Sequence, residues 1–438
     1  MKIAVLTLLS TISVVLAEQK LGFVFEIVRH GARAPLLEEP DGFFKVKAGM
    51  LTAQGMRQRY LLGRLNRDRY IDQYGLIDKD YNPKQILITS TNYLRTIQSS
   101  YSEMMGLYPP HSFTKSKLSE GENQSLKSGK GLPKLARSSK QEDIERLGSL
   151  VDGYTFIPVY NYYELPLEDD VSQKTCPFTR DCFNYYYKTP SEFTQEGKYV
   201  LPFMRESVGK AFNLSADDIK NMDYLKYYYY GDIIHAESFE GDPNRYKFSV
   251  EEWYYMRQSQ RIVLSKGLND QAKKLYGTKF FRKPLKAMAD RFNDLINGND
   301  NPDQLRYMIY SGHDDQIVNI IDWLNPQGHE YIDATYTSTI YFELFYDTDC
   351  LKANPKSHSC FEMHMRHNGV PIKFDTCVNN NMQAQSGSIL CKYDDFLTYM
   401  NSKMITDDVN VRCMDKFTPP TTQKKKEKGF WHLFDKNK

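Results

Sequence analysis

Apolar and polar positions along the chain predict strands that alternate with helices. Residues 21–28 (LGFVFEIV) form a nearly continuous apolar run rich in β-formers, which is typical of a strand buried on both faces. A helix is predicted to follow Leu51, with Thr52 as its N-cap. Met56, Tyr60, Gly63 and Leu65 recur along neighbouring faces of this helix. This strand, loop and helix form the first unit.

The same order recurs twice. Residues 86–89 predict a short strand, and residues 93–107 predict a helix that ends before two prolines. Far downstream, residues 306–310 predict a strand and residues 316–324 a helix. An amphipathic helix before them is marked by Leu285, Met288, Phe292, Leu295 and Ile296. We therefore expect an α/β fold with a mostly parallel sheet flanked by helices.

Two insertions and a tail complete the predicted organisation. Residues 112–140 are rich in Ser, Lys and Gly without periodicity, which predicts a surface loop. Residues 166–295 are rich in Tyr and Phe with helical stretches, which predicts an inserted, mostly helical cap. The α/β core then comprises residues 18–165 and 296–417, and a basic tail follows at 418–438.

Residues 1–17 predict a secretory signal peptide. Lys2 precedes an apolar stretch, and Ala17 ends a small-residue cleavage site, so the mature chain would begin near Glu18. No later stretch approaches the run of about 20 apolar residues that a membrane helix needs. We therefore expect a protein without a transmembrane anchor in the secretory pathway, either secreted or in the lysosomal lumen.

The cysteines and glycosylation sequences agree with an oxidising compartment. Most of the seven cysteines should pair as disulfides, although the sequence fixes neither their connectivity nor the odd thiol. They are Cys176, Cys182, Cys350, Cys360, Cys377, Cys391 and Cys413. Asn123 and Asn213 each begin an Asn-x-Ser sequence, which predicts surface N-glycosylation.

The charges nearly balance. There are 57 Lys and Arg residues against 55 Asp and Glu, which gives a formal net charge of +2. This balance disfavours a dedicated nucleic-acid-binding protein, which needs a broad basic surface. The function must therefore be sought in local groups of residues.

Residues 29–35 (RHGARAP) follow the first predicted strand directly. In open α/β sheets, ligands bind outside the carboxyl ends of the strands. Arg29 and Arg33 flank His30 there as a cationic cup, and guanidinium forks match phosphate oxygens. Gly31 allows a close approach of the backbone. The segment predicts a phosphate-binding site.

Two other strand-to-helix junctions carry suitable side chains. His313 and Asp314 follow the third predicted strand (YSGHDD), and Arg95 follows the second (STNYLRT). In a parallel sheet these loops share an edge with residues 29–35. A His-Asp pair alone is more often a surface or capping pair, and Arg95 alone would be a solvated helix residue. Their shared edge makes them candidates for the same site.

Together these segments resemble the histidine acid phosphatases, the secreted and lysosomal branch of the histidine phosphatase superfamily. The resemblance spans roughly residues 20–400 and matches the two insertions poorly. It rests on RHGARAP at 29–35, LTAQGMRQRYLLG at 51–63, STNYLRT at 90–96 and YSGHDDQ at 310–316. It implies a phosphoglycerate mutase-like core with a helical cap. It also implies an enzyme that hydrolyses small phosphate monoesters without a metal or other cofactor. Family members are often homodimers.

The resemblance also implies residue roles. His30 would be the nucleophile that forms a phosphohistidine, and Asp314 would protonate the leaving alcohol. The phosphoryl oxygens would be held by Arg29, Arg33, Arg95 and His313. Three guanidinium charges suit this chemistry, because they stabilise the phosphoryl transition state and lower the pKa of His30. A dianionic substrate would push Asp314 toward protonation, so we expect an acid pH optimum.

One departure from the family pattern and three alternatives stay open. Many members carry a small hydroxyl residue after the His-Asp pair, whereas this chain has Asp315, which leaves the leaving-group preference and the pH range open. A phytase-like activity on inositol phosphates is one alternative. Residues 166–295 carry 20 Lys and Arg against 19 Asp and Glu, and so nearly neutral a cap disfavours a heavily phosphorylated substrate. A metal-dependent phosphohydrolase is another, with residues 329–333 (HEYID) as the nearest metal motif. The third is a secreted phosphoester-binding protein without catalysis.

Overall fold

The structure is a computed structural model that describes residues 19–37, 43–110, 117–127, 154–161, 176–188, 195–241, 246–265, 268–377 and 391–419. The predicted signal peptide, most of the predicted surface loop and nearly all of the basic tail lie outside these ranges. The strands are β1 (Gln19–Arg29), β2 (Ile86–Ser90), β3 (Tyr307–Gly312), β4 (Thr339–Asp347), β5 (Phe361–His367), β6 (Val370–Pro371) and β7 (Cys391–Lys392).

The helices before β3 are α1 (Ala53–Arg67), α2 (Leu94–Leu107), α3 (Glu120–Lys127), α5 (Pro177–Lys188), α7 (Gln195–Ala211), α8 (Ala216–Lys220), α9 (Tyr224–Glu240), α10 (Val250–Gln260) and α11 (Asp270–Ile296). Those after β3 are α12 (Asp314–Leu324), α13 (Thr348–Ala353), α14 (Tyr393–Lys403) and α15 (Val409–Cys413).

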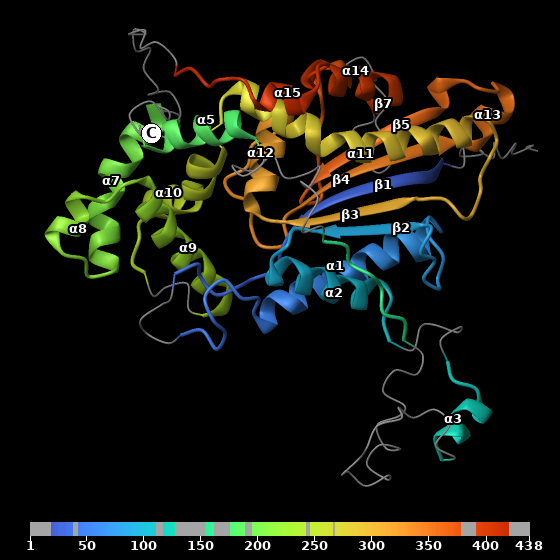
Figure 1. Ribbon diagram of the computed structural model, residues 1–438, viewed down its shortest axis with the longest axis horizontal. Helices are drawn as coiled ribbons and strands as arrows, with labels where there is room; N and C mark the ends of the chain where they lie inside the picture. Colours follow the sequence, from blue (N-terminus) through green and yellow to red (C-terminus); the bar gives the residue numbers. More distant parts are fainter. Residues whose placement is uncertain are drawn as a thin grey trace, which may run out of the picture.

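The seven strands form one sheet (Figure 1). Their order is β2-β3-β1-β4-β5-β6, and β7 pairs with β5. The predicted parallel pairing holds for β2, β3 and β1, whereas β4 to β7 pair antiparallel, so the sheet is mixed rather than mostly parallel. The loop before β4 explains the change. Thr337 N–H in this loop donates to the His30 carbonyl oxygen (3.2 Å), so β4 starts at the carboxyl end of β1 and runs against it.

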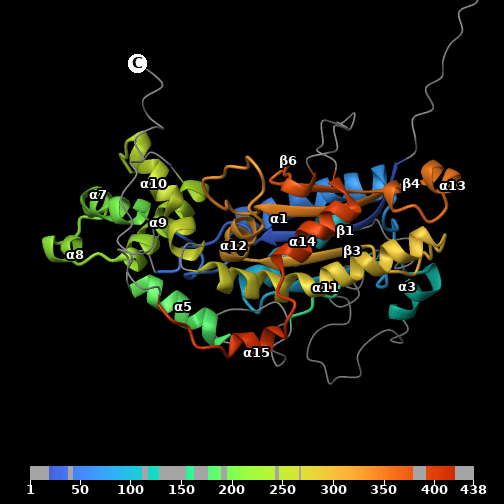
Figure 2. The same cartoon turned by 90° about the horizontal axis from the view of Figure 1, so that it is seen from above.

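The side chains of β1 alternate between two helical layers. Phe23, Phe25 and Ile27 pack in a cluster with residues of α11, α12 and α14. Val24 and Val28 pack in a second cluster with residues of α2. The two sets of helices lie on opposite faces of the sheet (Figures 1 and 2). The predicted strand buried on both faces is confirmed.

Local capping fixes where the helices of the site begin. The Thr52 side chain accepts a hydrogen bond from Gly55 N–H (3.1 Å) at the start of α1, as predicted. Helix α12 begins at Asp314 rather than at Gln316, because the Gln316 side chain accepts a hydrogen bond from His313 N–H (2.7 Å) and so fixes the helix start. The candidate proton donor Asp314 is therefore the first residue of a helix.

Helices α7, α8, α9 and α10 form a separate lobe, on the left in Figure 1, and α7, α9 and α10 enclose an apolar core. Helix α11 behaves differently, because its Met288 and Phe292 pack with Phe23 of the sheet. The expected cap, residues 166–295, therefore stays a proposal, and these contacts favour a boundary near Ser265.

Three disulfides join six of the cysteines. The pairs are Cys176–Cys413, Cys350–Cys360 and Cys377–Cys391. The seventh cysteine, Cys182, is a buried thiol whose Sγ accepts a hydrogen bond from Asn269 N–H (3.4 Å). The expectation that most cysteines pair is confirmed.

The glycosylation sequences lie at two different places. Asn123 lies in α3, and Asn213 is exposed in the turn before α8. N-glycosylation at both stays a prediction. Among the described residues, no helix combines the length and the hydrophobicity needed to cross a bilayer.

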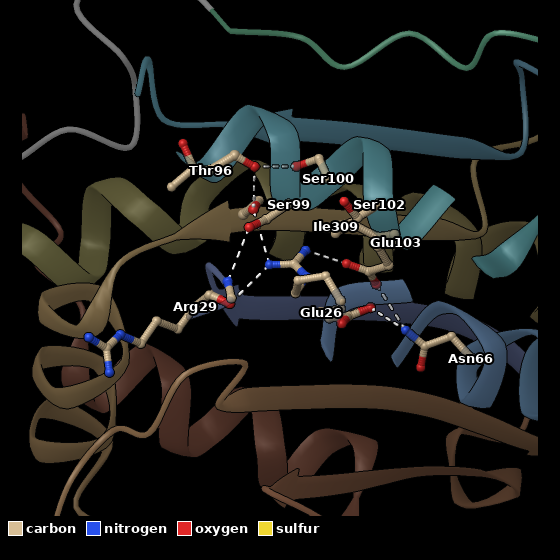
Figure 3. A network of polar contacts seen from close by, with 12 residues as sticks. Glu26, Arg29, Asn66, Thr96, Ser99, Ser100, Ser102, Glu103 and Ile309 are labelled. Atoms are coloured by element: carbon tan, nitrogen blue, oxygen red, sulfur yellow. Dashed lines mark hydrogen bonds and ion pairs between the residues drawn. The ribbon is translucent and has the colours of Figure 1, made fainter. Parts of the chain in front are cut away.

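One buried polar group interrupts the apolar face of β1. The Glu26 carboxyl is fully buried and accepts hydrogen bonds from the Asn66 amide (3.1 Å) and the hydroxyls of Tyr307 and Tyr341. The Asn66 amide also donates to Glu103 (3.0 Å), and these residues lie together in one network (Figure 3). Burial, followed by the nearby Glu103 carboxylate, raises the pKa of Glu26 well above its usual value.

This raised pKa predicts a protein that is more stable in acid. As the pH rises from the unfolded-state pKa of Glu26 toward the folded-state value, the unfolded chain loses the proton that the native state retains, so stability falls. Glu26→Gln removes the ionisable group and should reduce this loss, measured as the difference in chemical-denaturation midpoints between about pH 5 and pH 7. The exposed variant Glu251→Gln is the control. An unchanged pH dependence in Glu26→Gln would contradict the prediction.

Candidate active site

The predicted site residues meet at one edge of the sheet. Arg29 ends β1, and His30 follows it. Arg95 lies in the first turn of α2 after β2, and His313 and Asp314 join β3 to α12. Because β1, β2 and β3 are parallel, their carboxyl ends lie side by side.

The His30 ring is buried and held in one tautomer. Its Nδ1 lies 2.7 Å from the Gly31 carbonyl oxygen, so Nδ1 carries the proton and donates it. Nε2 then has a free lone pair. The His30 backbone is also fixed, because its N–H donates to the Gly312 carbonyl oxygen (2.9 Å). The candidate nucleophile is therefore oriented by the fold itself.

Gly31 allows the His30 loop to pack against α1. A Cβ placed on Gly31 would lie 2.1 Å from the Gly55 carbonyl oxygen, and one on Gly55 would lie 2.0 Å from the Ala32 carbonyl oxygen. The close approach expected at Gly31 is thus to the start of a helix. Gly31 N–H also donates to Ser99 Oγ in α2 (3.1 Å), so two helices hold the loop.

His313 is engaged through both ring nitrogens. Arg95 Nη2 donates to His313 Nδ1 (3.2 Å), because a guanidinium has no acceptor. His313 Nε2 therefore carries the proton and donates to Thr91 Oγ1 (2.9 Å). The Tyr93 ring lies edge-on to His313, with the ring centroids 4.9 Å apart. A phosphoryl oxygen would reach His313 only by replacing one of these contacts.

Arg29 lies between Asp314 and an aromatic ring. Its Nη2 contacts Asp314 Oδ2 at 2.9 Å, and its Nη1 donates to the Ala334 carbonyl oxygen (2.5 Å). The guanidinium carbon lies 4.2 Å from the centroid of the Tyr336 ring, within the range of a cation–π contact. The Tyr336 centroid is also 5.8 Å from that of the His30 ring.

Arg33 is paired with a carboxylate from the lobe of α7 to α10. Its Nη1 and Nη2 form a bidentate pair with Asp232 of α9, at 3.0 and 2.7 Å. Asp232 also accepts a hydrogen bond from Leu36 N–H (2.8 Å). Sequence reasoning missed Asp232 and Tyr336, because each lies far along the chain from Arg29 and Arg33 and neither follows one of the three predicted strands of the site.

The charges at this edge shift the titration of the site. Burial, then Arg29 and Arg33, lowers the pKa of His30 well below its usual value. Burial and Arg95 lower that of His313 in the same way. Burial raises the pKa of Asp314, but the guanidinium groups outweigh it, so that this pKa lies below its usual value. At neutral pH in the ligand-free protein these directions favour neutral rings for both histidines and the carboxylate form of Asp314.

Four guanidinium donors at this edge lack an acceptor among the described residues. They are the buried Nε atoms of Arg29, Arg33, Arg95 and Arg59. A buried donor without an acceptor is costly. Anionic oxygen atoms are the acceptors that suit such a group of guanidinium N–H donors best.

The nearest metal motif in the sequence does not form a ligand cluster. His329 Nε2 contacts His367 Nδ1 (2.9 Å), Glu330 is exposed, and Asp333 pairs with Arg257 (2.7 Å). No group of three or more histidine, cysteine, aspartate or glutamate side chains among the described residues could hold a metal ion.

Asp315 forms hydrogen bonds in the first turn of α12. Its N–H donates to Asp314 Oδ1 (3.1 Å), and its Oδ2 accepts from Gln316 Nε2 (3.3 Å). The residue that departs from the family pattern thus fixes the orientation of Asp314 through the backbone.

Comparison with known sequences agrees with this geometry. Residues 20–366, more than half of the chain, match the family model of the histidine phosphatase superfamily (branch 2). The lysosomal acid phosphatase of Xenopus laevis is 37% identical over 114 residues, which cover 25% of this chain and 26% of that protein. The testicular acid phosphatase of Homo sapiens is 36% identical over 102 residues, which cover 22% and 23%. The chain thus spans about a quarter of the length of these relatives.

Solved structures share the fold. The phytase from Citrobacter braakii superposes with a TM-score of 0.56 at 12% identity, over 89% of this chain and 98% of that one. Hafnia alvei phytase in complex with myo-inositol hexakis sulphate gives a TM-score of 0.55 at 14% identity, over 90% and 98%. At this level of identity the likeness concerns the architecture alone.

The lowered pKa of His30 is directly testable. In the ligand-free protein its ring should titrate well below the ordinary histidine pKa of about 6.5. The measurement is an NMR titration of the ring resonance, assigned with His30→Ala. Arg95→Met removes one nearby positive charge and should raise the His30 pKa. A wild-type resonance that titrates near the ordinary value would contradict the electrostatic account.

Proposed function

The chain belongs to branch 2 of the histidine phosphatase superfamily, and from this membership we propose that it is a metal-independent acid phosphatase acting through a phosphohistidine on His30. Small phosphate monoesters are the proposed substrates. The observation that carries the proposal is the meeting of a neutral His30, whose Nε2 has a free lone pair, with the guanidinium groups of Arg29, Arg33 and Arg95. This combination provides a nucleophile within a preorganised anion site.

In the first step, His30 Nε2 attacks the phosphorus atom of the monoester. The N–P bond forms while the bond from phosphorus to the alcohol oxygen breaks. Charge spreads over three phosphoryl oxygens in the transition state, and the buried guanidinium groups stabilise it where they already lie. Each of the three retains an Nε–H without an acceptor among the described residues.

Asp314 supplies the proton that the leaving alcohol takes. The guanidinium groups favour its carboxylate in the ligand-free protein. A bound phosphate dianion neutralises these groups and adds negative charge, so it raises the pKa of Asp314 in the complex. An acid pH optimum follows from this requirement for a protonated Asp314.

The second step regenerates the enzyme. The Asp314 carboxylate removes a proton from a water molecule, which attacks the phosphohistidine. The N–P bond breaks, inorganic phosphate leaves, and Asp314 is again protonated while His30 Nε2 recovers its lone pair. Asp314 lies in the first turn of α12, where the helix dipole favours the carboxylate form that this step needs.

The proposed location is the secretory pathway, with the protein secreted or in the lysosomal lumen. The three disulfides and the likeness to proteins named lysosomal acid phosphatase support it. A homodimer is part of the proposal on the family resemblance alone.

Hydrolysis of an aryl phosphate between about pH 4 and pH 8, in chelator, tests the proposal. We expect acid-optimal turnover that His30→Ala abolishes and that Asp314→Asn slows by about 10²- to 10⁴-fold. His358→Ala, which removes a histidine at a surface ion pair, is the matched control. Turnover that survives His30→Ala or depends on added metal would overturn the mechanism. Phosphate binding without turnover in the wild type would favour a binding protein.

Substrate profiling distinguishes the phytase-like alternative. Asp232 already neutralises Arg33 at the cap side of the site, which disfavours a substrate with many phosphate groups. We therefore expect aryl and sugar phosphates to give a kcat/KM at least as high as that of phytate. A clear preference for phytate would replace our assignment of the substrate class.

A further inference from the structure

One motif that carries the family resemblance has no role in the mechanism above. The segment LTAQGMRQRYLLG forms the start of α1, and its Arg59 is completely buried. Arg59 lies beneath the strand edge that carries the site, on the side of α1 and α2. Burial and the charges of Arg29 and Arg33 are the main causes of the lowered pKa of His30, so the role of Arg59 must be sought in its own contacts.

Arg59 contacts both strands that carry the catalytic histidines. Its Nη1 donates to the carbonyl oxygen of Arg29 (2.9 Å) and to Ser311 Oγ (3.3 Å). Arg29 ends β1 immediately before His30, and Ser311 lies in β3 two residues before His313. One guanidinium therefore spans the ends of two neighbouring strands.

The same guanidinium is bound to α2. Arg59 Nη2 forms an ion pair with Glu103, and both side chains are fully buried. Ser311 Oγ in turn donates to the carbonyl oxygen of Thr96 (3.2 Å), the residue that follows Arg95. Figure 3 shows the Arg29 side chain extending away from Glu26, Asn66 and Glu103, while its backbone takes part in the network.

We propose that Arg59 is a positioning residue, which holds His30, His313 and Arg95 in register by joining the ends of β1 and β3 to α2. The proposal rests on the proposed function for its effect on turnover. A buried ion pair contributes little net stability compared with apolar side chains of similar volume. The main effect of the Arg59–Glu103 pair is therefore to fix the position of the groups that Arg59 contacts. A loss of register by about 1 Å at a catalytic group can cost about 10²-fold in rate.

Arg59→Lys is the principal test. A lysine retains a positive charge opposite Glu103, so the ion pair and the fold are preserved, but one ammonium cannot replace a planar fork that reaches two segments. We expect kcat to fall by about 10- to 100-fold, while KM and inhibition by inorganic phosphate change little. Arg67→Lys is the matched control on the same helix, since Arg67 donates to the Leu107 carbonyl oxygen of α2 (2.9 Å) away from the site.

A second variant separates positioning from folding. Arg59→Met leaves Glu103 as an uncompensated buried charge and should lower the thermal unfolding midpoint. Arg59→Met/Glu103→Gln removes both charges and should recover the midpoint without recovering kcat. A wild-type kcat in either the double variant or Arg59→Lys would overturn the proposal, because the ion pair would then be merely structural.

Hydrogen exchange makes the test independent of the proposed function. In Arg59→Lys, the backbone amides of His30 and Gly31 should exchange faster than in the wild type and in Arg67→Lys. Unchanged exchange at both amides would overturn the positioning role even if the protein had no phosphatase activity. Absence of turnover in the wild type, with accelerated exchange in the variant, would overturn only the function.

Discussion

The burial of several guanidinium groups at one edge of a sheet is the constraint around which this structure is arranged. A buried charge without a partner costs several kcal/mol, so each group needs an opposite charge nearby. Asp314 of α12 pairs with Arg29, Asp232 of α9 pairs with Arg33, and Glu103 of α2 pairs with Arg59. Asp314 and Glu103 come from core helices on opposite faces of the sheet, and Asp232 comes from the lobe of α7 to α10. Correct packing of all three elements is therefore a condition for the site to exist.

The same arrangement links the lobe of α7 to α10 to the edge proposed to bind phosphate. Asp232 accepts both a bidentate pair from Arg33 and the Leu36 backbone N–H, so one carboxylate fixes two parts of the loop after His30. Tyr336, which stacks on Arg29, also faces His235 of α9 with ring centroids 5.4 Å apart. A change in this lobe would thus reach Arg29 and Arg33 through charge and ring contacts.

The sequence could predict the parts of this fold that depend on local patterns. The apolar run of β1, the Thr52 cap and the site residues at three strand ends follow from periodicity and motif position, and the structure brings those residues together. The direction of β4 could not be predicted, because it depends on a loop that returns to His30 rather than on the strand's own residues. Asp232 and Glu26 were missed for a related reason. A lone carboxylate in an apolar segment gives no signal until its partners, more than 150 residues away for Asp232 and Arg33, are placed in space.

The disulfide between Cys176 and Cys413 determines what a single proteolytic cut can release from the chain. It joins residues 237 positions apart, just before α5 and at the end of α15, and so encloses helices α5 to α15 and strands β3 to β7 in one covalent ring. A protease that cuts one peptide bond inside this ring opens it without releasing a fragment. The nicked protein keeps every packed element attached, so its lifetime in a protease-rich compartment would be limited by the second cut rather than by the first.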